Sequence, residues 1–180
     1  MKVLRLFAAV LAVAVLLFVA SLAFFSSRFY EPAFVVRSTV ALPAGLKQSW
    51  SLLSGFSSYP KWNPYLIKVE GHFAVGGVLE VQLIDGNFDD VLTVKPTVSE
   101  IVPGQSFCWR GKLKLPGLFD TRHCFVLKKS NTAGTLLEQF EEFGGLVAHI
   151  VPAEQNMTAH VEKAFNKMHQ AMVVKLSSSH

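Results

Sequence analysis

FCWRGKLKLPGLFDTRHCFVLKKSNTAGTLLEQFEEFGGL, residues 107–146, is the stretch that decides the fold. An alternating pattern begins just before this stretch and runs from Gln105 to Leu115. One face carries Phe107, Trp109, Gly111, Leu113 and Leu115, and the other carries Arg110, Lys112 and Lys114. Alternation of period two over this length predicts a half-buried β-strand. Pro116-Gly117 interrupts the pattern and predicts a turn.

Two more strands follow in the same stretch. The next strand places His123, Phe125 and Leu127 on one face, and a third strand is predicted from Thr135 to Phe143 after a turn at Asn131–Gly134. The three strands form an antiparallel meander with one apolar face and one charged face. A sheet of this kind must bury its apolar face against another part of the chain. The position of that cover decides where a cavity could lie.

The composition sets limits on the partners of the chain. Of its 180 residues, 51% are hydrophobic and 17% are charged, which is more apolar than an ordinary soluble domain. The formal net charge of +4 owes much to Lys2, Arg5 and Arg28, near the N-terminus. Without these three, 14 Lys and Arg face 13 Asp and Glu, so the remainder is nearly neutral. It has no basic excess of the kind that nucleic-acid binding requires, and we expect no nucleic-acid partner.

The apolar excess lies in Leu6–Ser27, a run of 22 residues without a charged side chain. As an α-helix this run would be about 33 Å long, enough for a bilayer core of about 30 Å. It is longer than the apolar region of a signal peptide, usually about 7–15 residues, although Ser21-Leu22-Ala23 offers a cleavage site. We therefore expect a single-pass anchor that contacts the lipid bilayer through residues 6–27, with a cleaved signal peptide as the alternative. Because Lys2 and Arg5 precede the run, the domain is expected on the non-cytoplasmic side.

The predicted domain boundaries follow from these patterns. Residues 1–28 form the anchor or signal peptide, 29–33 a short linker, 34–176 the folded domain and 177–180 a frayed tail. Before the meander we expect a strand at 33–42, a short helix at 45–55, a further short helix or turn, and strands at 65–73, 78–84 and 90–102.

After Gly144-Gly145 the apolar period changes to that of a helix. From Ala153 onward, one face of the predicted helix is apolar and the opposite face carries charged and amide side chains. The apolar stripe consists of Met157, Val161, Ala164, Phe165, Met168, Ala171, Met172 and Leu176. The order strand, two short helices, six strands and a long helix predicts an α+β fold, in which a curved antiparallel sheet wraps around the C-terminal helix.

Several segments carry a resemblance to a known superfamily. They are Phe56–Pro64, Pro96–Gly104 with Phe107–Gly111, Pro116–Asp120 with Arg122–Phe125, Gln139–Leu146, and Ala164-Phe165 with Met168. Together they resemble the polyketide cyclase/dehydrase-like subgroup of the SRPBCC or START-like helix-grip superfamily, which includes the birch-pollen allergen type. The resemblance covers about Phe34 to Lys175 and implies a helix-grip fold, commonly with a cavity. The chain departs from the pattern at His169, where such helices often carry asparagine.

Seven inward-facing side chains are predicted to lie between the sheet and the helix, where they would line a hydrophobic ligand cavity. They are Trp109, Phe125, Phe140, Phe143, Phe165, Met168 and Met172. The alternative is an ordinary packed core, since aromatic residues and methionines on inward faces usually just pack. The resemblance shifts the expectation toward a cavity.

His123 and Glu141 are the candidates for acid–base chemistry in such a cavity. If Glu141 faces apolar side chains, desolvation raises its pKa and makes it a credible general base. A structural histidine is nevertheless the favoured interpretation of His123. A solvent-facing carboxylate is the favoured interpretation of Glu141, because the third strand carries polar residues on both faces. We expect no cofactor, and two cysteines without suitably spaced histidines predict no metal site.

Cys108 and Cys124 lie on neighbouring predicted strands and could form a disulfide in an oxidising compartment. A hairpin folded about Pro116-Gly117, however, is predicted to bring Cys124 nearer to Gly111 than to Cys108. Two buried free thiols are therefore the favoured expectation.

The sequence thus predicts a membrane-anchored domain that binds a hydrophobic small molecule of lipid, isoprenoid or quinone type. A cyclase- or dehydratase-type enzyme using the same cavity is the first alternative, although binding is favoured over catalysis. A protein-interaction module is the second alternative, and it would use the basic face that carries Arg110, Lys112 and Lys114.

Overall fold

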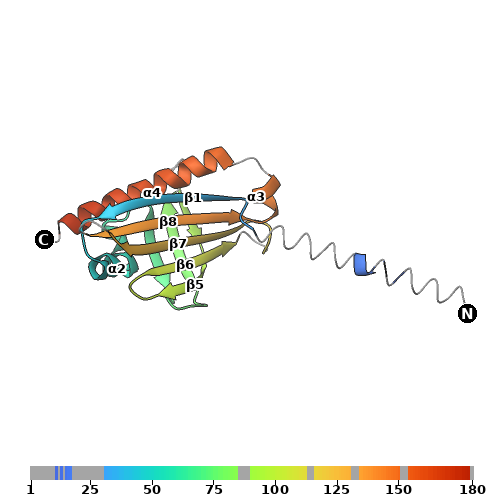
Figure 1. The fold of residues 1–180 in the computed structure, drawn as a ribbon, viewed down its shortest axis with the longest axis horizontal. Coiled ribbons are helices and arrows are strands. Elements are labelled where there is room, and N and C mark those ends of the chain that lie inside the picture. Colours follow the sequence, from blue (N-terminus) through green and yellow to red (C-terminus); the bar gives the residue numbers. More distant parts are fainter. Residues whose placement is uncertain are drawn as a thin grey trace, which may run out of the picture.

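The computed structural model describes residues 11, 13, 15–17, 31–84, 90–112, 116–130, 134–150 and 154–178. Its elements follow one another in an order close to the predicted one (Figure 1). They are β1 (Phe34–Leu42), α2 (Leu46–Ser54), the 3-10 helix η1 (Phe56–Lys61), β2 (Leu66–Gly71), β3 (Leu79–Ile84), β4 (Val91–Val94), β5 (Thr97–Val102), β6 (Ser106–Lys112), β7 (Asp120–Lys129), β8 (Thr135–Gly144), α3 (Leu146–Ile150) and α4 (Glu154–Ser177).

Five antiparallel strands form the larger sheet, in the order β1-β8-β7-β6-β5 (Figure 1). The predicted meander is its centre, and β1 pairs with the outer edge of β8 along its whole length. In the β6–β7 ladder, Phe107 lies opposite Phe125 and Trp109 lies opposite His123. The alternation seen in the sequence therefore brings aromatic side chains of neighbouring strands together on one face.

The strands β2, β3 and β4 form a second, three-stranded antiparallel sheet. The chain passes from this sheet into the larger one at Lys95-Pro96, between β4 and β5. Proline has no N–H to donate to a ladder, so the strand breaks there. A bridge between Val78 and Thr97, and a hydrogen bond from the Leu79 N–H to the Pro96 carbonyl, form a seam between the two sheets. The prediction of one strand over residues 90–102 is therefore wrong.

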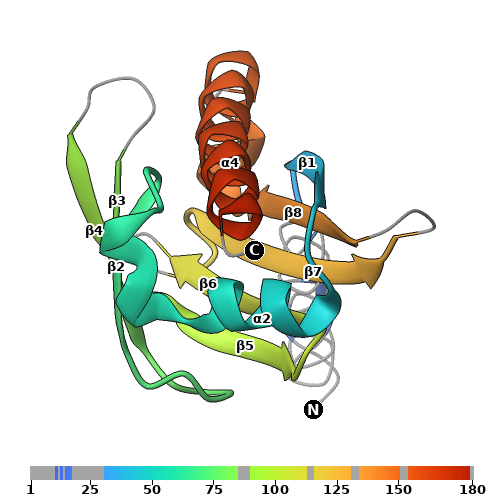
Figure 2. The same cartoon turned by 90° about the vertical axis from the view of Figure 1, so that its left-hand side faces the viewer.

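The long helix α4 lies on the concave side of the sheets. Figure 2 shows this arrangement in a view almost along the helix axis. Its apolar stripe faces inward, and the buried members are Ala164, Phe165, Met168, Met172 and Leu176. Burial of these large apolar side chains is the main force that holds the helix to the sheet. The predicted α+β architecture, a curved antiparallel sheet around a long C-terminal helix, is confirmed. The stripe did not predict that His169 is buried as well.

The core is filled by aromatic rings beneath α2. Phe107 lies at the centre of this cluster, with the ring centroids of its neighbours 4.8 to 6.1 Å away. These neighbours are Trp50, Phe56, Phe73, Trp109 and Phe125. Many of these rings meet edge to face, a favourable arrangement for aromatic pairs. The molecule is therefore densely packed at this end.

The predicted membrane localisation is contradicted. Among the described residues, no helix combines the length and the apolar character that crossing a bilayer requires. Of the predicted anchor Leu6–Ser27, the structure describes Leu11, Val13 and Val15–Leu17. The other residues of that run lie outside the described residues. The prediction of a single-pass anchor, with the domain on the non-cytoplasmic side, is corrected accordingly.

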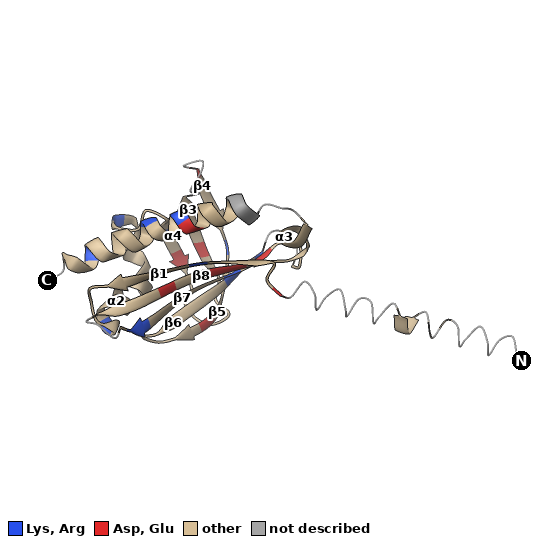
Figure 3. Cartoon of the chain, turned by 45° about the horizontal axis from the view of Figure 1, so that its top comes forward, with Lys and Arg blue, Asp and Glu red and all other residues tan. Residues whose placement is uncertain are grey.

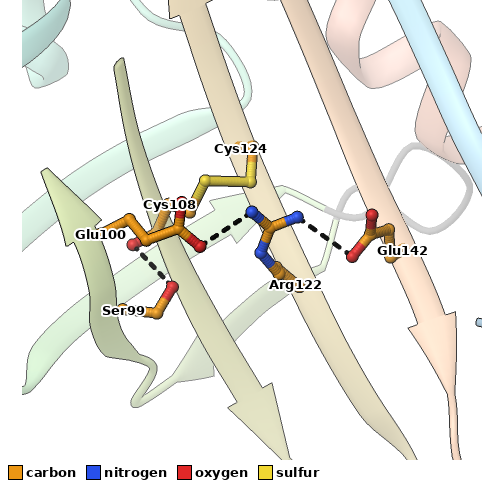
Figure 4. Close-up of polar contacts among 6 residues, drawn as sticks. All are labelled: Ser99, Glu100, Cys108, Arg122, Cys124 and Glu142. Atoms are coloured by element: carbon orange, nitrogen blue, oxygen red, sulfur yellow. Dashed lines mark hydrogen bonds and ion pairs between the residues drawn. A yellow bond between two sulfur atoms is a disulfide. The ribbon is translucent and has the colours of Figure 1, made fainter. Parts of the chain in front are cut away.

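Cys108 and Cys124 form a disulfide on the outer face of the larger sheet (Figure 4). The β6–β7 ladder pairs Cys108 directly with Cys124, and their Cα atoms are 4.1 Å apart. Gly111 instead lies opposite Thr121. The expectation of two free thiols is therefore wrong, because the hairpin is centred on Pro116 and the predicted register was shifted.

Figure 3 marks both acidic and basic residues along the strands of the larger sheet. Arg122 on β7 binds Glu100 on β5 at 2.8 Å and Glu142 on β8 at 3.2 Å (Figure 4). Phe140 lies on the same face of the sheet as Arg122, with the guanidinium carbons of Arg37 and Arg122 at 4.5 and 5.7 Å from its ring centroid. The prediction that Phe140 lines the interior is therefore wrong, since β8 turns its other face inward.

Candidate functional site

A cavity of about 790 Å³ lies between the two sheets and the first turns of α4. Most of its lining side chains are apolar, among them Leu66, Val81, Leu83, Ile84, Leu92, Val94, Trp109, Phe119, Phe143, Met157, Val161 and Ala164. The polar ones are Tyr65, Thr93, Lys95, Lys112, Thr121, His123, Glu141 and His160. Its size falls within the range of small-molecule sites, about 300–1,000 Å³.

One corner of this cavity is polar. The β7–β8 register places His123 directly opposite Glu141, and both side chains turn inward. The Nδ1 atom of His123 lies 3.8 Å from Oε2 of Glu141. Thr121, two residues earlier on the same face of β7, hydrogen-bonds to the Glu141 side chain. Strand alternation thus brings a carboxyl, an imidazole and a hydroxyl together.

Burial shifts the pKa values of this corner in opposite directions. Desolvation raises the pKa of Glu141 to about 7, and the hydrogen bond from Thr121 opposes this rise. Desolvation lowers the pKa of His123 to about 3, and repulsion from His169 adds to the effect. At neutral pH His123 is therefore uncharged, while Glu141 exchanges its proton readily. Such a carboxyl can bind a donor group or act as a general acid or base.

Gln139 connects this corner to the helix. It is completely buried on β8 and bridges two histidines, donating from Nε2 to Nε2 of His123 and accepting at Oε1 from Nε2 of His169, each over 2.9 Å. Because an amide has one donor end and one acceptor end, two uncharged histidines beside it must take opposite roles. In this arrangement the ring proton of His123 lies on Nδ1, the atom that faces Glu141.

The row of polar side chains continues to the surface. Burial lowers the pKa of His169 to about 4, so this ring is also neutral. Its Nδ1 atom lies 3.4 Å from Oγ of Ser38, which in turn donates to Oδ1 of Asn166 over 2.8 Å. A second hollow of about 400 Å³ opens here between β1 and α4, lined by Thr39, Val40, Asn166, His169, Gln170, Val173 and Val174. Hydrogen bonds through Gln139 thus connect the polar corner of the cavity to the second hollow.

Solved structures with the same arrangement identify the fold. A START superfamily protein from Mycobacterium smegmatis matches with a TM-score of 0.63 at 15% identity, over 81% of this chain and 99% of its own. The Zhui aromatase/cyclase from Streptomyces sp. R1128 matches with a TM-score of 0.63 at 20% identity, over 80% and 93% of the two chains. Ara h 8.0201 matches with a TM-score of 0.61 at 13% identity, over 81% and 98%. The chain has the helix-grip fold.

The helix-grip resemblance seen in the sequence is thereby confirmed at the level of fold. No protein-family model and no curated protein matches the sequence. A fold shared at such low identity hosts many functions, so function has to be argued from the helix-grip cavity itself.

Only some of the residues predicted to line a cavity border the helix-grip cavity. Trp109 and Phe143 line it, as do both polar candidates, His123 and Glu141. The other inward-facing members of the predicted set are buried in the core without lining the cavity, and they are Phe125, Phe165, Met168 and Met172. These four follow the ordinary-core alternative.

Sequence reasoning missed three residues of the polar corner. Because β8 carries polar residues on both faces, the sequence left open whether Gln139 points inward. No pattern in the sequence distinguished Thr121. Gly111 had been treated as one more small residue, yet a Cβ there would come within 2.8 Å of Oγ1 of Thr121. The absence of a Cβ at Gly111 therefore leaves room for the Thr121 hydroxyl on the wall of the helix-grip cavity.

The basic face predicted for a protein partner is only partly described by the structure. Arg110 and Lys112 are both exposed, and Lys112 also contributes to the lining of the cavity. Lys114 lies outside the described residues, so the interaction module stays a prediction. Across the described part of the chain, no group of His, Cys, Asp and Glu side chains is arranged to hold a metal ion.

Proposed function

We propose that this helix-grip chain binds a hydrophobic small molecule, of lipid, isoprenoid or quinone type, between its sheets and α4. The observation that carries the proposal is the cavity of about 790 Å³, with largely apolar walls and one polar corner. Small-molecule sites combine concave apolar walls with a few placed polar groups in this way. A structure of the same fold is named an aromatase/cyclase, which supports the use of such an interior for a small molecule.

Filling the cavity from α4 tests the proposal. Val161 lines the cavity, whereas Val75 is 66% exposed and lines neither hollow. We expect Val161→Trp in the full-length chain to weaken binding of an apolar fluorescent dye at least about tenfold, because the indole occupies the binding volume. Val75→Trp, the same substitution away from both hollows, should leave dye binding unchanged.

Native mass spectrometry gives the second measurement. Wild-type protein should retain apolar molecules that organic extraction releases, and Val161→Trp should retain fewer. Circular dichroism establishes that both variants are folded. A folded Val161→Trp variant that binds dye and lipid extract as tightly as wild type would overturn the proposal.

The pKa of Glu141 favours a second candidate function, an enzyme that removes a proton from the bound molecule. A carboxyl whose pKa is about 7 in a largely apolar site is suited to general acid–base catalysis at neutral pH. When the extracted occupant is returned to wild-type protein in heavy water, we expect it to gain deuterium at an acidic C–H position. Glu141→Gln, compared at an equal amount of bound occupant, should not show this exchange. A loaded wild-type protein that leaves its occupant free of deuterium rules this function out.

A further inference from the structure

The Glu141 carboxyl keeps hydrogen-bonding capacity that faces the cavity. An ionised carboxylate offers about four acceptor positions on its two oxygens. The Thr121 hydroxyl fills one of them. The Nδ1 atom of His123, at 3.8 Å, is too distant for a hydrogen bond. The Glu141 side chain is only 13% exposed, so any further donor has to come from within the cavity.

No cation among the described residues offsets a charge on this carboxyl. Its one ion-pair partner there is His123, which burial keeps neutral. Arg122, next to His123 in the sequence, points to the opposite face of the sheet, where it binds Glu100 and Glu142. A carboxylate withdrawn from water without a cation is costly. A ligand that brings a donor or a positive charge lowers this cost.

The surroundings of Glu141 suit a head group that is joined to an apolar body. Gly111 lies opposite Thr121 in the β6–β7 ladder, and the absence of a Cβ there leaves room for the Thr121 hydroxyl that binds Glu141. Trp109 and Phe143 line the same cavity. Their ring faces can pack against an apolar body or attract an ammonium group through a cation–π interaction.

We propose that the occupant of the cavity carries a hydrogen-bond-donating head group, an ammonium or a hydroxyl, at one end of an apolar body, and that this head group binds Glu141. The inference rests on the binding function proposed above and names the chemical class of the ligand. An anionic head group is repelled from this corner once Glu141 is ionised. Lys95, Lys112 and His160 also line the cavity, so an anion would bind elsewhere along the wall.

A matched ligand series tests the inference. Dodecylamine, dodecanol and dodecanoic acid share one chain and differ only in the head group. Their affinities for the full-length protein are measured by displacement of an apolar dye at about pH 8, above the pKa of Glu141, which is about 7. We expect the amine, the alcohol or both to bind about tenfold or more tightly than the acid, the effect of one hydrogen bond to a charged group.

Two variants assign the preference to a residue. Glu141→Gln should remove most of the advantage of the amine over the acid, because the amide carries no charge. Glu162→Gln, an exposed position on α4, should keep the wild-type ranking. Equal affinities for all three ligands, or tightest binding of the acid, overturn the inference and leave the binding function standing. Failure of all three to displace the dye overturns both.

The pH dependence separates the two donor head groups. Between about pH 6 and pH 8 an alkyl ammonium keeps its charge, while Glu141 ionises through its pKa of about 7. The affinity for dodecylamine should therefore rise with pH, and that for dodecanol should change little. The other titratable groups on the cavity wall are Tyr65, Lys95, Lys112, His123 and His160. A rise that persists in Glu141→Gln but disappears in His160→Gln would overturn the assignment to Glu141.

Discussion

His123, Gln139 and His169 form a buried row in which both imidazole rings are uncharged. Protonating either ring would place a charge in the core, and protonating His123 would also set its Nε2–H against the donor end of the amide. In the unfolded chain both histidines regain their ordinary pKa of 6.5. The folded values, about 3 and about 4, are lower. Acid therefore favours the unfolded chain at these two residues.

We expect the free energy of unfolding to fall as the pH is lowered from about 7 to about 4.5. Over this range the unfolded state binds more protons at His123 and His169 than the folded state does. Glu141 acts in the opposite sense, because its pKa is raised from 4.5 to about 7 and its folded form binds the extra proton. Together these three groups lower the free energy of unfolding by about 2 kcal/mol between the two pH values.

Urea denaturation at the two pH values measures this loss. His169→Asn removes one of the two histidines that cause this loss. It should therefore strongly reduce the dependence of the unfolding free energy on pH. His72→Asn, at an exposed position, should not change it. Equal unfolding free energies at both pH values in wild-type protein would contradict the expectation.

The strand β8 shows why the polar corner could be predicted only in part. From Glu138 to Glu142 the sequence carries polar residues on both faces, with Phe140 in the middle. Hydrophobicity alone favours Phe140 as the inward side chain, and it is wrong. Gln139 tolerates burial because His123 and His169, distant in the sequence, satisfy both ends of its amide. Local pattern does not contain that information, whereas uninterrupted alternation on β7 was enough to place His123 on the same face as Phe125.

At the scale of elements, the β6–β7 hairpin has a different task on each face. Its inner face supplies Trp109 and His123 to the cavity, and its outer face carries the bond between Cys108 and Cys124. A slip of one residue in a strand ladder would exchange the two faces. The covalent link between directly opposite residues excludes such a slip and so protects the geometry of the cavity wall.

Removing this link should destabilise the fold. We expect the double variant Cys108→Ala and Cys124→Ala to lose about 3 kcal/mol of unfolding free energy, because the bond closes a loop with a sequence separation of 16. Urea denaturation with and without a reducing agent provides the measurement. The reductant should shift the wild-type midpoint and leave the double variant unchanged. A wild-type midpoint that stays constant, with both thiols shown by mass to be reduced, would disagree with this account.

Element prediction succeeded where one periodicity ran without interruption. The meander and the stripe of α4 are examples, because period two and the helical period are properties of local sequence. It failed at Lys95-Pro96, where residues on both sides favour strand and the chain nevertheless changes sheets. It also failed for the cysteines, where a small error in the centre of a hairpin changed the pairing. Periodicity reveals that a strand is present, but neither its partner nor its register.

At the scale of the whole molecule, the cavity exists because two sheets and one helix enclose more volume than their side chains fill. Aromatic rings around Phe107 fill the end beneath α2. Toward β3, β4 and the first turns of α4, smaller side chains leave about 790 Å³ open. The helix-grip architecture was predictable from element order, but the location of this space depends on the joint between the sheets, which the sequence pattern concealed.

That joint also has a kinetic consequence. The smaller sheet is connected to β5 by the bridge from Val78 to Thr97 and by neighbouring backbone hydrogen bonds, such as that of Leu79 with Pro96. Parting this seam leaves the disulfide-linked ladder of the larger sheet intact. Local openings of this kind require less free energy than unfolding of the whole domain. Where release requires such an opening, the frequency of opening sets the residence time of an occupant, so two ligands of different affinity can be released at the same rate.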